Sequence, residues 1–310
     1  MTTYSYRSSL ALALVSLICL TGTLPAGAQE RFSTSEEAIK ALANAVSSKD
    51  TNTINRIFGP ALQGLVSPDA VQASNSFTVF RQRFAQKVQP VPQSDAKIVL
   101  DLGADAWPFP IPLVKEGGQW FFDTAAGQEE ILNRRVGRNE LDTISVCHAY
   151  VEAQRDYASE DQMGDHVLAY AQQLRSAPGK HDGLYWHAEP GERISPLGPL
   201  IAQARGEGYT HKSKIMTDAQ VPYHGYFFKI LTCQGSHAPG GKYNYIINGR
   251  MIAGFALVAW PAQWGNSGVM TFIVNQEGRV FERNLGPKTD ALARKMKAYD
   301  PGPLWKPAEE

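Results

Sequence analysis

Between residues 35 and 88, apolar positions recur at the three-to-four-residue spacing of helices that bury one face. The stretch Ser33–Glu36 reads as a capping box, and Asp50 reads as the cap of a short second helix that Gly59-Pro60 would end. Pro68 stands where a third helix would begin, since the first helical position needs no N–H. The predicted buried positions are Ala38, Leu42, Ala45 and Val46, then Ile54, Ile57 and Phe58, then Phe77, Phe80, Phe84 and Val88. The pattern predicts that helices open the fold.

After residue 90 the period falls to about two, which is typical of strands. Gly117-Gly118 marks a turn that would fold one strand back on the next. Pro108, Pro110 and Pro112 lack the N–H that a sheet ladder uses, so their strand is predicted at a sheet edge. The predicted strands are Ile98–Leu100, Ile111–Val114 and Trp120–Phe122.

The helical period returns after Asp123, and Gly137 is predicted to divide this stretch into two helices. The buried stripe of the second helix is Leu141, Ile144, Cys147, His148, Val151 and Ala158. Ser176–Pro222 is rich in glycine and proline and is predicted to be a long loop with a turn or two of helix after Pro199.

Five strand-like runs follow, separated by short gaps that favour an antiparallel meander, because a parallel crossover needs a dozen residues or more. The runs are Tyr226–Cys233, Tyr243–Ile247, Gly254–Trp260, Val269–Val274 and Arg279–Leu285. Asp290–Tyr299 is predicted to be a terminal helix.

Together the patterns predict an α+β protein. N-terminal helices with a small curved antiparallel sheet would be followed by a long helix packed on a C-terminal antiparallel β-meander. A chain of 310 residues suggests about two domains. We expect an N-terminal α+β domain at residues 29–136 and a C-terminal domain at residues 137–310, with the long loop at 176–222.

The first 28 residues have the features of a secretory signal peptide. Arg7 precedes an apolar run, Leu10–Leu20, and Ala26-Gly27-Ala28 is a small-x-small cleavage pattern. The run has about 11 residues, whereas a membrane-spanning helix needs roughly 20. We therefore expect cleavage after Ala28, a periplasmic or secreted protein, and no transmembrane anchor after signal cleavage.

Charge and motifs exclude several classes of function. Basic and acidic residues both number 30, so no net field attracts nucleic acid. The chain contains no dinucleotide fingerprint, P-loop or zincin motif, so neither a cofactor nor catalytic residues are predicted. His181, Asp182, His187 and His211 match no compact ligand spacing, and no metal site is predicted. The expected partner is an envelope protein or polymer whose identity the sequence does not reveal.

Removal of the signal peptide leaves two cysteines, Cys147 and Cys233. In an oxidising compartment they admit a single intramolecular disulfide. The alternative is two buried free thiols that pack as small apolar residues. Sequence alone does not give the separation that a disulfide requires, so both alternatives stay open.

Aromatic residues at loop-to-strand junctions are the candidate ligand contacts, because large rings with a polar tip stack on sugars or grip peptides. The candidates, with one adjacent histidine, are Tyr185, Trp186, Tyr223, His224, Trp260 and Trp264. The alternative is that these rings close the ends of the core. Trp260 ends an apolar strand and should be buried, whereas Trp264 lies in the following turn and should be partly exposed.

Long motifs spread over nearly the whole mature chain resemble a bacterial exported family catalogued as domain of unknown function 2950. They are "WPFPIPLV", "QWFFDTAAGQEEILNRRVGRNEL", "DGLYW", "SPLGPL", "PYHGYFF" and "GFALVAWPAQWGNSGVMTFIVNQEGRVFERNLG". The resemblance implies an exported envelope protein and supplies no catalytic residues. We expect a non-catalytic binding or envelope-assembly protein. The alternative is a hydrolase that acts on a cell-wall or other envelope polymer.

The C-terminal half is also similar in pattern to the globular domains of type IV pilins and pseudopilins. Those proteins carry an N-terminal assembly helix, whereas this chain has a cleavable signal. A filament subunit is therefore not expected.

Overall fold

The structure is a computed structural model that describes residues 29–209 and 221–309. The predicted signal peptide and His211 lie outside the described residues. Within the described part of the chain, no helix combines the length and the apolar character that crossing a membrane requires.

Helices open the fold, as predicted, but two of them begin one or two residues later than expected. The first helices are α1 (Ser35–Ser48), α2 (Thr51–Phe58), the 3₁₀ helix η1 (Pro60–Leu65) and α3 (Ala70–Gln86). Thr34, not Ser33, caps α1 by accepting the N–H of Glu37. Asp69 caps α3 by accepting the N–H groups of Val71 and Gln72, so Pro68 precedes that helix. A carboxylate at the N-cap satisfies two free amides, which the proline could not do.

The N-terminal sheet is antiparallel, as predicted, and packs against α1 to α3. Its strands are β1 (Val88–Ser94), β2 (Lys97–Leu102), β3 (Trp107–Pro108), β4 (Leu113–Glu116) and β5 (Gln119–Phe122). The order is β1-β2-β4-β5, with β3 also on β2. The edge-strand prediction for Ile111–Val114 is wrong, because β4 lies between β2 and β5. Pro110 and Pro112 precede β4 in an irregular segment, so the sheet does not need their missing N–H groups.

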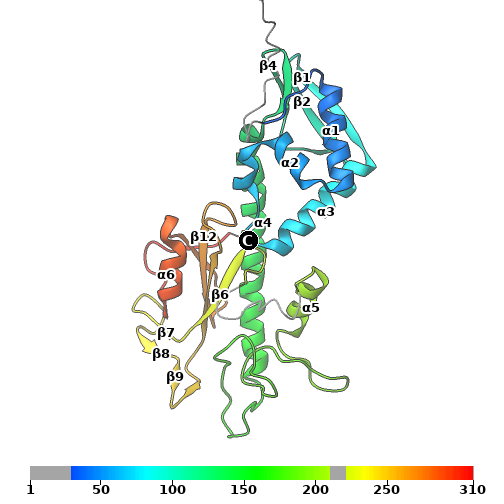
Figure 1. The fold of residues 1–310 in the computed structure, drawn as a ribbon. Helices are drawn as coiled ribbons and strands as arrows, with labels where there is room; N and C mark the ends of the chain where they lie inside the picture. The colour runs from blue at the N-terminus through cyan, green and yellow to red at the C-terminus, as the bar shows by residue number, and fades with distance from the viewer. Residues whose placement is uncertain (1–28, 210–220, 310) are drawn as a thin grey trace, which may run out of the picture.

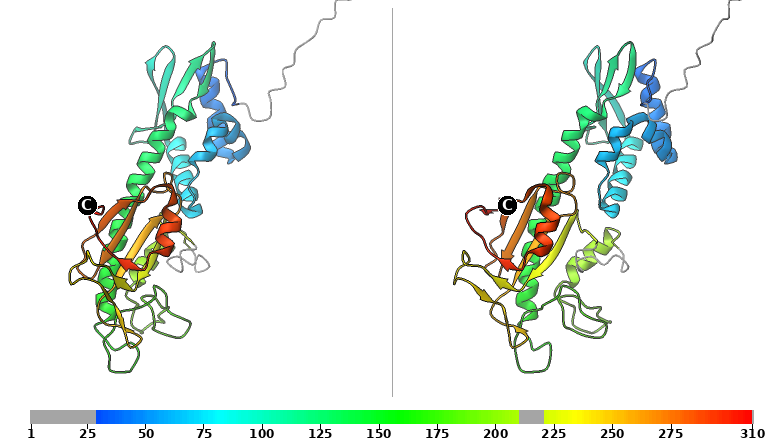
Figure 2. Two further views of the ribbon diagram at one scale, coloured as in Figure 1. Left: turned by 90° about the vertical axis from the view of Figure 1, so that its left-hand side faces the viewer. Right: turned by 60° about the vertical axis from the view of Figure 1, so that its left-hand side comes forward.

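Helix α4 (Thr124–Tyr157) has 34 residues and runs the length of the molecule. The prediction that Gly137 divides it is wrong. A glycine inside a helix costs about 1 kcal/mol relative to alanine, which packing on both sides of it outweighs. Figure 2 shows α4 passing from the N-terminal sheet down behind the C-terminal sheet. The predicted boundary between residues 136 and 137 falls inside this helix, and the division into domains stays a prediction.

The C-terminal sheet is antiparallel, as predicted. Its strands are β6 (Tyr226–Leu231), β11 (Ala256–Pro261), β12 (Met270–Asn275), β13 (Phe281–Asn284) and β15 (Lys306–Pro307), in the order β15-β13-β12-β11-β6. The short strands around it are β7 (Cys233–Gln234), β8 (Tyr243–Asn244), β9 (Ile246–Ile247), β10 (Arg250–Met251) and β14 (Ala298–Tyr299). The predicted run Tyr243–Ile247 is not a strand of the C-terminal sheet, because β6 pairs directly with β11 and that run divides between two smaller sheets. The C-terminal sheet lies between α4 and α6 (Thr289–Lys295) (Figure 1). The predicted terminal helix is shorter than expected, because Ala298–Tyr299 pairs with β7 instead.

The described residues form two hydrophobic clusters. One consists of α1, α2, part of α3 and the N-terminal sheet. The other consists of α4 from Ile144 onward, the C-terminal sheet and the packed part of the long loop, including α5 (Gly198–Gly206). Helix α4 contributes to both, through Ile131 at one end and the Ile144–Tyr157 segment at the other. Leu141, predicted to be buried, lies between the clusters and is 56% exposed.

Candidate functional site

A cleft of about 580 Å³ lies between α3 and α4 and is closed at one end by residues that follow α5. We call it the interhelix cleft. Figure 1 shows α3 and α5 on the same side of α4. The residues that line the interhelix cleft come from α3, from α4 and from loops. They are Gln72, Asn75, Ser76, Val79, Phe80 and Arg83 from α3, Trp107 and Pro110, then Ile131, Arg134, Arg135, Arg138, Asn139 and Asp142 from α4, and finally Glu207, Tyr209 and His224.

His224 is held between two carboxylates at the closed end of the cleft. Its Nδ1 lies 2.8 Å from Asp142 Oδ2, and its Nε2 lies 2.5 Å from Glu207 Oε2. The Tyr223 ring stacks on the imidazole, with 4.2 Å between ring centroids. His224 has a φ of 47°, a left-handed conformation that non-glycine residues rarely adopt. The surrounding contacts therefore fix both the backbone and the ring of His224. We call His224, Asp142 and Glu207 the histidine clamp.

The clamp keeps the imidazole protonated. Burial opposes the charged form and lowers the pKa of His224, but hydrogen bonds and charges from Asp142 and Glu207 together outweigh it. The net effect raises the pKa to about 9. At neutral pH both ring nitrogens therefore carry protons and donate to carboxylates. The clamp has a net charge of −1.

A buried carboxylate connects the clamp to the start of α3. Asp69 is 2% exposed, and its Oδ2 accepts the hydroxyl of Tyr209 at 2.6 Å and the N–H of Gly225 at 3.1 Å. The Tyr209 hydroxyl in turn accepts the N–H of His224. Burial and the nearby Asp69 raise the pKa of Tyr209, so its hydroxyl stays a donor. This chain of hydrogen bonds links one wall of the cleft to its closed end.

Arginines line the α4 wall of the cleft. Arg134 pairs with Glu130, and Arg83 on the opposite wall pairs with Asp105. Their guanidinium carbons lie 5.4 Å and 5.1 Å from the ring centroid of Trp107. Arg138 is exposed, and within the described residues it has no hydrogen bond or ion pair.

Arg135 joins the two halves of the molecule beside the cleft. Its guanidinium donates to the carbonyl of Leu65 in η1 and to Asn266 Oδ1 in the β11–β12 turn. The Asn266 amide donates to the carbonyls of Gly64 and Val66. Burial lowers the pKa of Arg135, because its charge is partly removed from water. These contacts hold the β11–β12 turn and α4 against η1.

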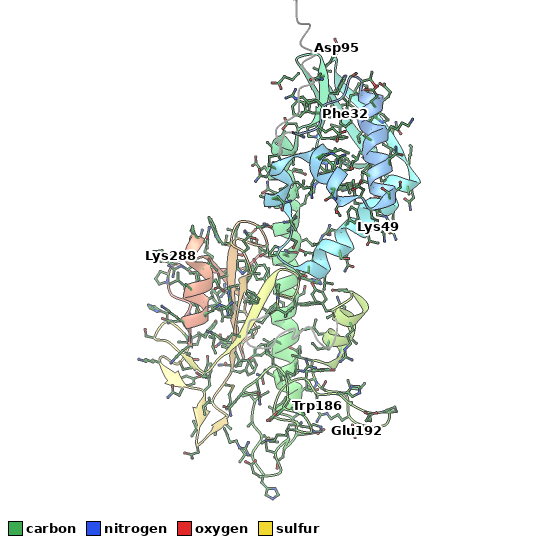
Figure 3. All side chains as sticks on the ribbon, in the orientation of Figure 1. Phe32, Lys49, Asp95, Trp186, Glu192 and Lys288 are labelled. Carbon is green, nitrogen blue, oxygen red and sulfur yellow. The ribbon has the colours of Figure 1, made fainter. Side chains whose placement is uncertain are left out.

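Most of the candidate aromatic residues are in the core. Tyr185, Trp186, Tyr223 and Trp260 are between 0% and 7% exposed. Figure 3 places Trp186 near the foot of α4, well below α3. Of the six candidates, His224 alone lines the interhelix cleft. The structure therefore does not gather these residues into one surface.

Trp260 and Trp264 have the burial that their sequence positions predict. Trp260 is 0% exposed, and its Nε1 donates to Asp290 Oδ1 at 2.9 Å. Trp264 is 37% exposed, and its Nε1 donates to Asn284 Oδ1 at 2.9 Å. The two tryptophans flank the tight turn between β11 and β12, which Gly265 closes by donating to the carbonyl of Gly268.

Cys147 and Cys233 are free thiols in the structure. Cys147 is buried on α4, and burial raises its pKa to about 12, so the thiol stays protonated. Cys233 is half-buried, with Sγ 3.3 Å from the carbonyl oxygen of Lys297. Of the two alternatives, the structure contains the unpaired thiols.

The histidines of the long loop serve local contacts. The His181 ring stacks on Trp186, and His187 lies 3.6 Å from a Glu189 carboxylate oxygen. Asp182 accepts the N–H of Ala177. Within residues 29–209 and 221–309, no three histidine, cysteine or acidic side chains are placed to hold a metal ion.

Sequence reasoning did not find the main residues of the cleft. Arg135, Arg138 and Asp142 are three and four positions apart, so their shared helix face was visible in the sequence. Glu207 carries no comparable signal, because its role depends on the approach of a loop to a helix 65 residues earlier in the chain.

Comparison with known proteins identifies the family. Searches of curated proteins and of solved structures found no match. The pilin-like pattern therefore stays a prediction. The sequence model described as "Protein of unknown function (DUF2950)" matches residues 29–308, which is almost the whole chain. This protein therefore belongs to the DUF2950 family, as its motifs predicted.

Proposed function

We propose that this protein is exported to the cell envelope, where it binds a ligand in the interhelix cleft without changing it chemically. The observation that carries the proposal is an open cleft with an arginine on its wall, Arg138, that has no partner among the residues that the structure describes. Its volume of about 580 Å³ falls within the roughly 300–1,000 Å³ of small-molecule sites.

The walls of the cleft are preorganised. Helix α4 is a single rigid element, and the contacts of Arg135 and Asp69 tie α3 and η1 to the C-terminal half. A site that is already formed loses little conformational entropy when a ligand enters. This favours a binding role for the cleft.

Binding explains the histidine clamp better than catalysis does. A general base needs a free lone pair, whereas both nitrogens of His224 are protonated and engaged. The alternative, a hydrolase of an envelope polymer, needs an available acid and base. In the described part of the long loop, Asp182 and Glu192 accept backbone N–H groups. Glu207 accepts from His224, and Glu189 Oε1 lies 3.6 Å from His187 Nε2.

Export is supported by the contacts of Gln29, the first residue after the predicted cleavage site. Its amide donates to the carbonyls of Ile57 and Phe122, so the fold includes the chain from this residue onward. Intact-mass measurement on protein from the envelope fraction should give a chain that begins at Gln29. A mass that includes residues 1–28, or a lipid on Cys19, would contradict cleavage after Ala28.

The cleft is tested with two fluorescent probes, anionic 8-anilinonaphthalene-1-sulfonate and neutral N-phenyl-1-naphthylamine. Ser76 lines the cleft on α3, whereas Ser74 is exposed on the same helix outside it. Ser76→Trp should fill the cleft and weaken binding of at least one probe by ten-fold or more, while Ser74→Trp should bind like the parent. Circular dichroism checks that both variants fold. If neither probe binds, or if Ser76→Trp binds as well as Ser74→Trp, the cleft is not the site.

A further inference from the structure

The charges of the cleft narrow the chemistry of its ligand. Resting on the proposed function above, we propose that the ligand carries an anionic group, which pairs with Arg138 beside Arg135, and an apolar portion, which packs between α3 and α4. Carboxylate, sulfonate and phosphate groups share this chemistry, and a guanidinium binds each of them through two parallel hydrogen bonds.

The balance of charge on the two walls supports an anion. The arginines next to Trp107 are already neutralised, Arg83 by Asp105 and Arg134 by Glu130. Within the described part of the chain, Arg135 donates only to neutral oxygens, those of Leu65 and Asn266. Arg138 has no partner within the described residues. Two positive charges therefore remain without a counter-ion on one helix face, three residues apart.

Burial increases the effect of Arg135. Its guanidinium is partly removed from water, so the charge has lost hydration that no carboxylate restores. An anion bound at the neighbouring Arg138 would supply the missing opposite charge. Coulomb attraction is several times stronger in such a partly buried place than in bulk water.

The closed end of the cleft determines where the anion lies. The histidine clamp has two carboxylates around one imidazolium and therefore a net negative charge. An anion is repelled from that end and attracted toward Arg138, one helical turn before Asp142 on α4. The arrangement orients the ligand as well as attracting it.

Apolar side chains line the part of the cleft beyond the arginines. Val79 on α3 is 47% exposed, and Phe80 and Ile131 are half-buried on the facing walls. An apolar or aromatic group that covers Val79 would remove its surface from water, a gain of roughly 25 cal/mol per Å². A ligand with both features uses the whole cleft, whereas a simple inorganic anion would use only Arg138.

The two probes separate this inference from the proposed function. Both have an apolar aromatic system, but only the sulfonate probe is anionic. The parent should bind the sulfonate probe at least ten-fold more tightly than the neutral one. Arg138→Gln should weaken sulfonate binding about ten-fold, leave neutral-probe binding within two-fold, and reduce the salt dependence of sulfonate binding.

Two control variants make the test specific. Arg138→Lys keeps the charge but not the two parallel hydrogen bonds, so its sulfonate affinity should lie between those of the parent and Arg138→Gln. Arg81→Gln removes the same charge from α3 outside the cleft and should have no effect. If both probes bind with equal affinity and Arg138→Gln matches Arg81→Gln, the anion inference is wrong, although a cleft blocked by Ser76→Trp would still support the proposed function.

Discussion

At the residue scale, His224 shows how position changes the chemistry of a side chain. An exposed histidine is mostly neutral at pH 7, whereas the clamp holds His224 as a cation. Its raised pKa makes folding stability depend on pH. In the unfolded state His224 has the ordinary histidine pKa of 6.5, whereas in the folded state its pKa is about 9. Between these pH values only the folded state holds the proton. The stabilisation from the charged imidazole is therefore complete below pH 6.5 and is lost as pH rises through 9.

His224→Asn should remove this dependence, since asparagine tolerates the left-handed conformation but does not titrate. The imidazole is 19% exposed, so the parent should lose on the order of 2 kcal/mol more than the variant between pH 6.5 and 9. Urea unfolding at a series of pH values measures the difference. Parallel stability curves for parent and variant would mean that the clamp does not hold a charged imidazole.

The two tryptophans of the β11–β12 turn should differ in their effect on stability. Trp260→Ala removes a fully buried ring and the hydrogen bond to Asp290, and should cost about 3–5 kcal/mol. Trp264→Ala removes a ring that is 37% exposed and should cost about 1 kcal/mol or less. Chemical denaturation compares them directly. Equal large losses would place both rings in the core and exclude Trp264 as a contact residue.

At the element scale, α4 is one continuous helix although it contains glycines. Substitutions at two of them test whether packing or helix propensity decides the stability at each position. Gly137 has no heavy atom within 4 Å of an added Cβ, so Gly137→Ala should stabilise the helix by about 0.5–1 kcal/mol. Gly127 is buried, and an added Cβ would lie 2.8 Å from both Ile111 Cγ1 and the carbonyl oxygen of Pro110.

Gly127→Ala should therefore destabilise the protein by about 1–3 kcal/mol, despite the same gain in helix propensity. Thermal or urea unfolding of the two variants gives the comparison. A loss of stability in Gly137→Ala would indicate a break or bend at that position, as the sequence pattern first indicated.

At the scale of the whole molecule, a few polar contacts hold the two hydrophobic clusters in register. The side chain of Asn266 makes several of these contacts. Its Nδ2 donates to carbonyls at the end of η1, and its Oδ1 accepts from Arg135. Asn266→Ala should cost about 1–3 kcal/mol, because it removes the hydrogen bonds to the carbonyls of Gly64 and Val66 and one of the two acceptors of the half-buried Arg135 guanidinium. Asn52→Ala, at an exposed position of α2, is the control and should change stability by less than about 0.5 kcal/mol.

The same variant should loosen the cleft. Amide hydrogen exchange should increase in η1 and in the β11–β12 turn of Asn266→Ala, while the centres of both sheets stay protected. Unchanged exchange in these two segments would mean that α4 alone fixes the relation between the clusters.

The sequence by itself determined the features that depend on neighbouring residues. Asp50 caps α2 as predicted, Glu130 pairs with Arg134, and Gly117-Gly118 turns β4 into β5. The α+β class, the antiparallel pairing of the C-terminal strands and the family also followed from pattern and motif. In each case the interacting groups are a few residues apart, or the pattern repeats along the chain, so local backbone preference and periodicity were sufficient.

Only the tertiary structure decided the features that depend on distant contacts. Gly137 stays helical because α4 packs on both hydrophobic clusters. Strand β4 is an interior strand because β2 pairs with it on one side and β5 on the other. The clamp joins residues 82 and 17 positions apart along the chain. Period and propensity describe only a residue's neighbours in sequence, whereas the charge of His224 depends on which surfaces meet when the chain folds. The same holds for Arg138, which has no counter-ion within the described residues.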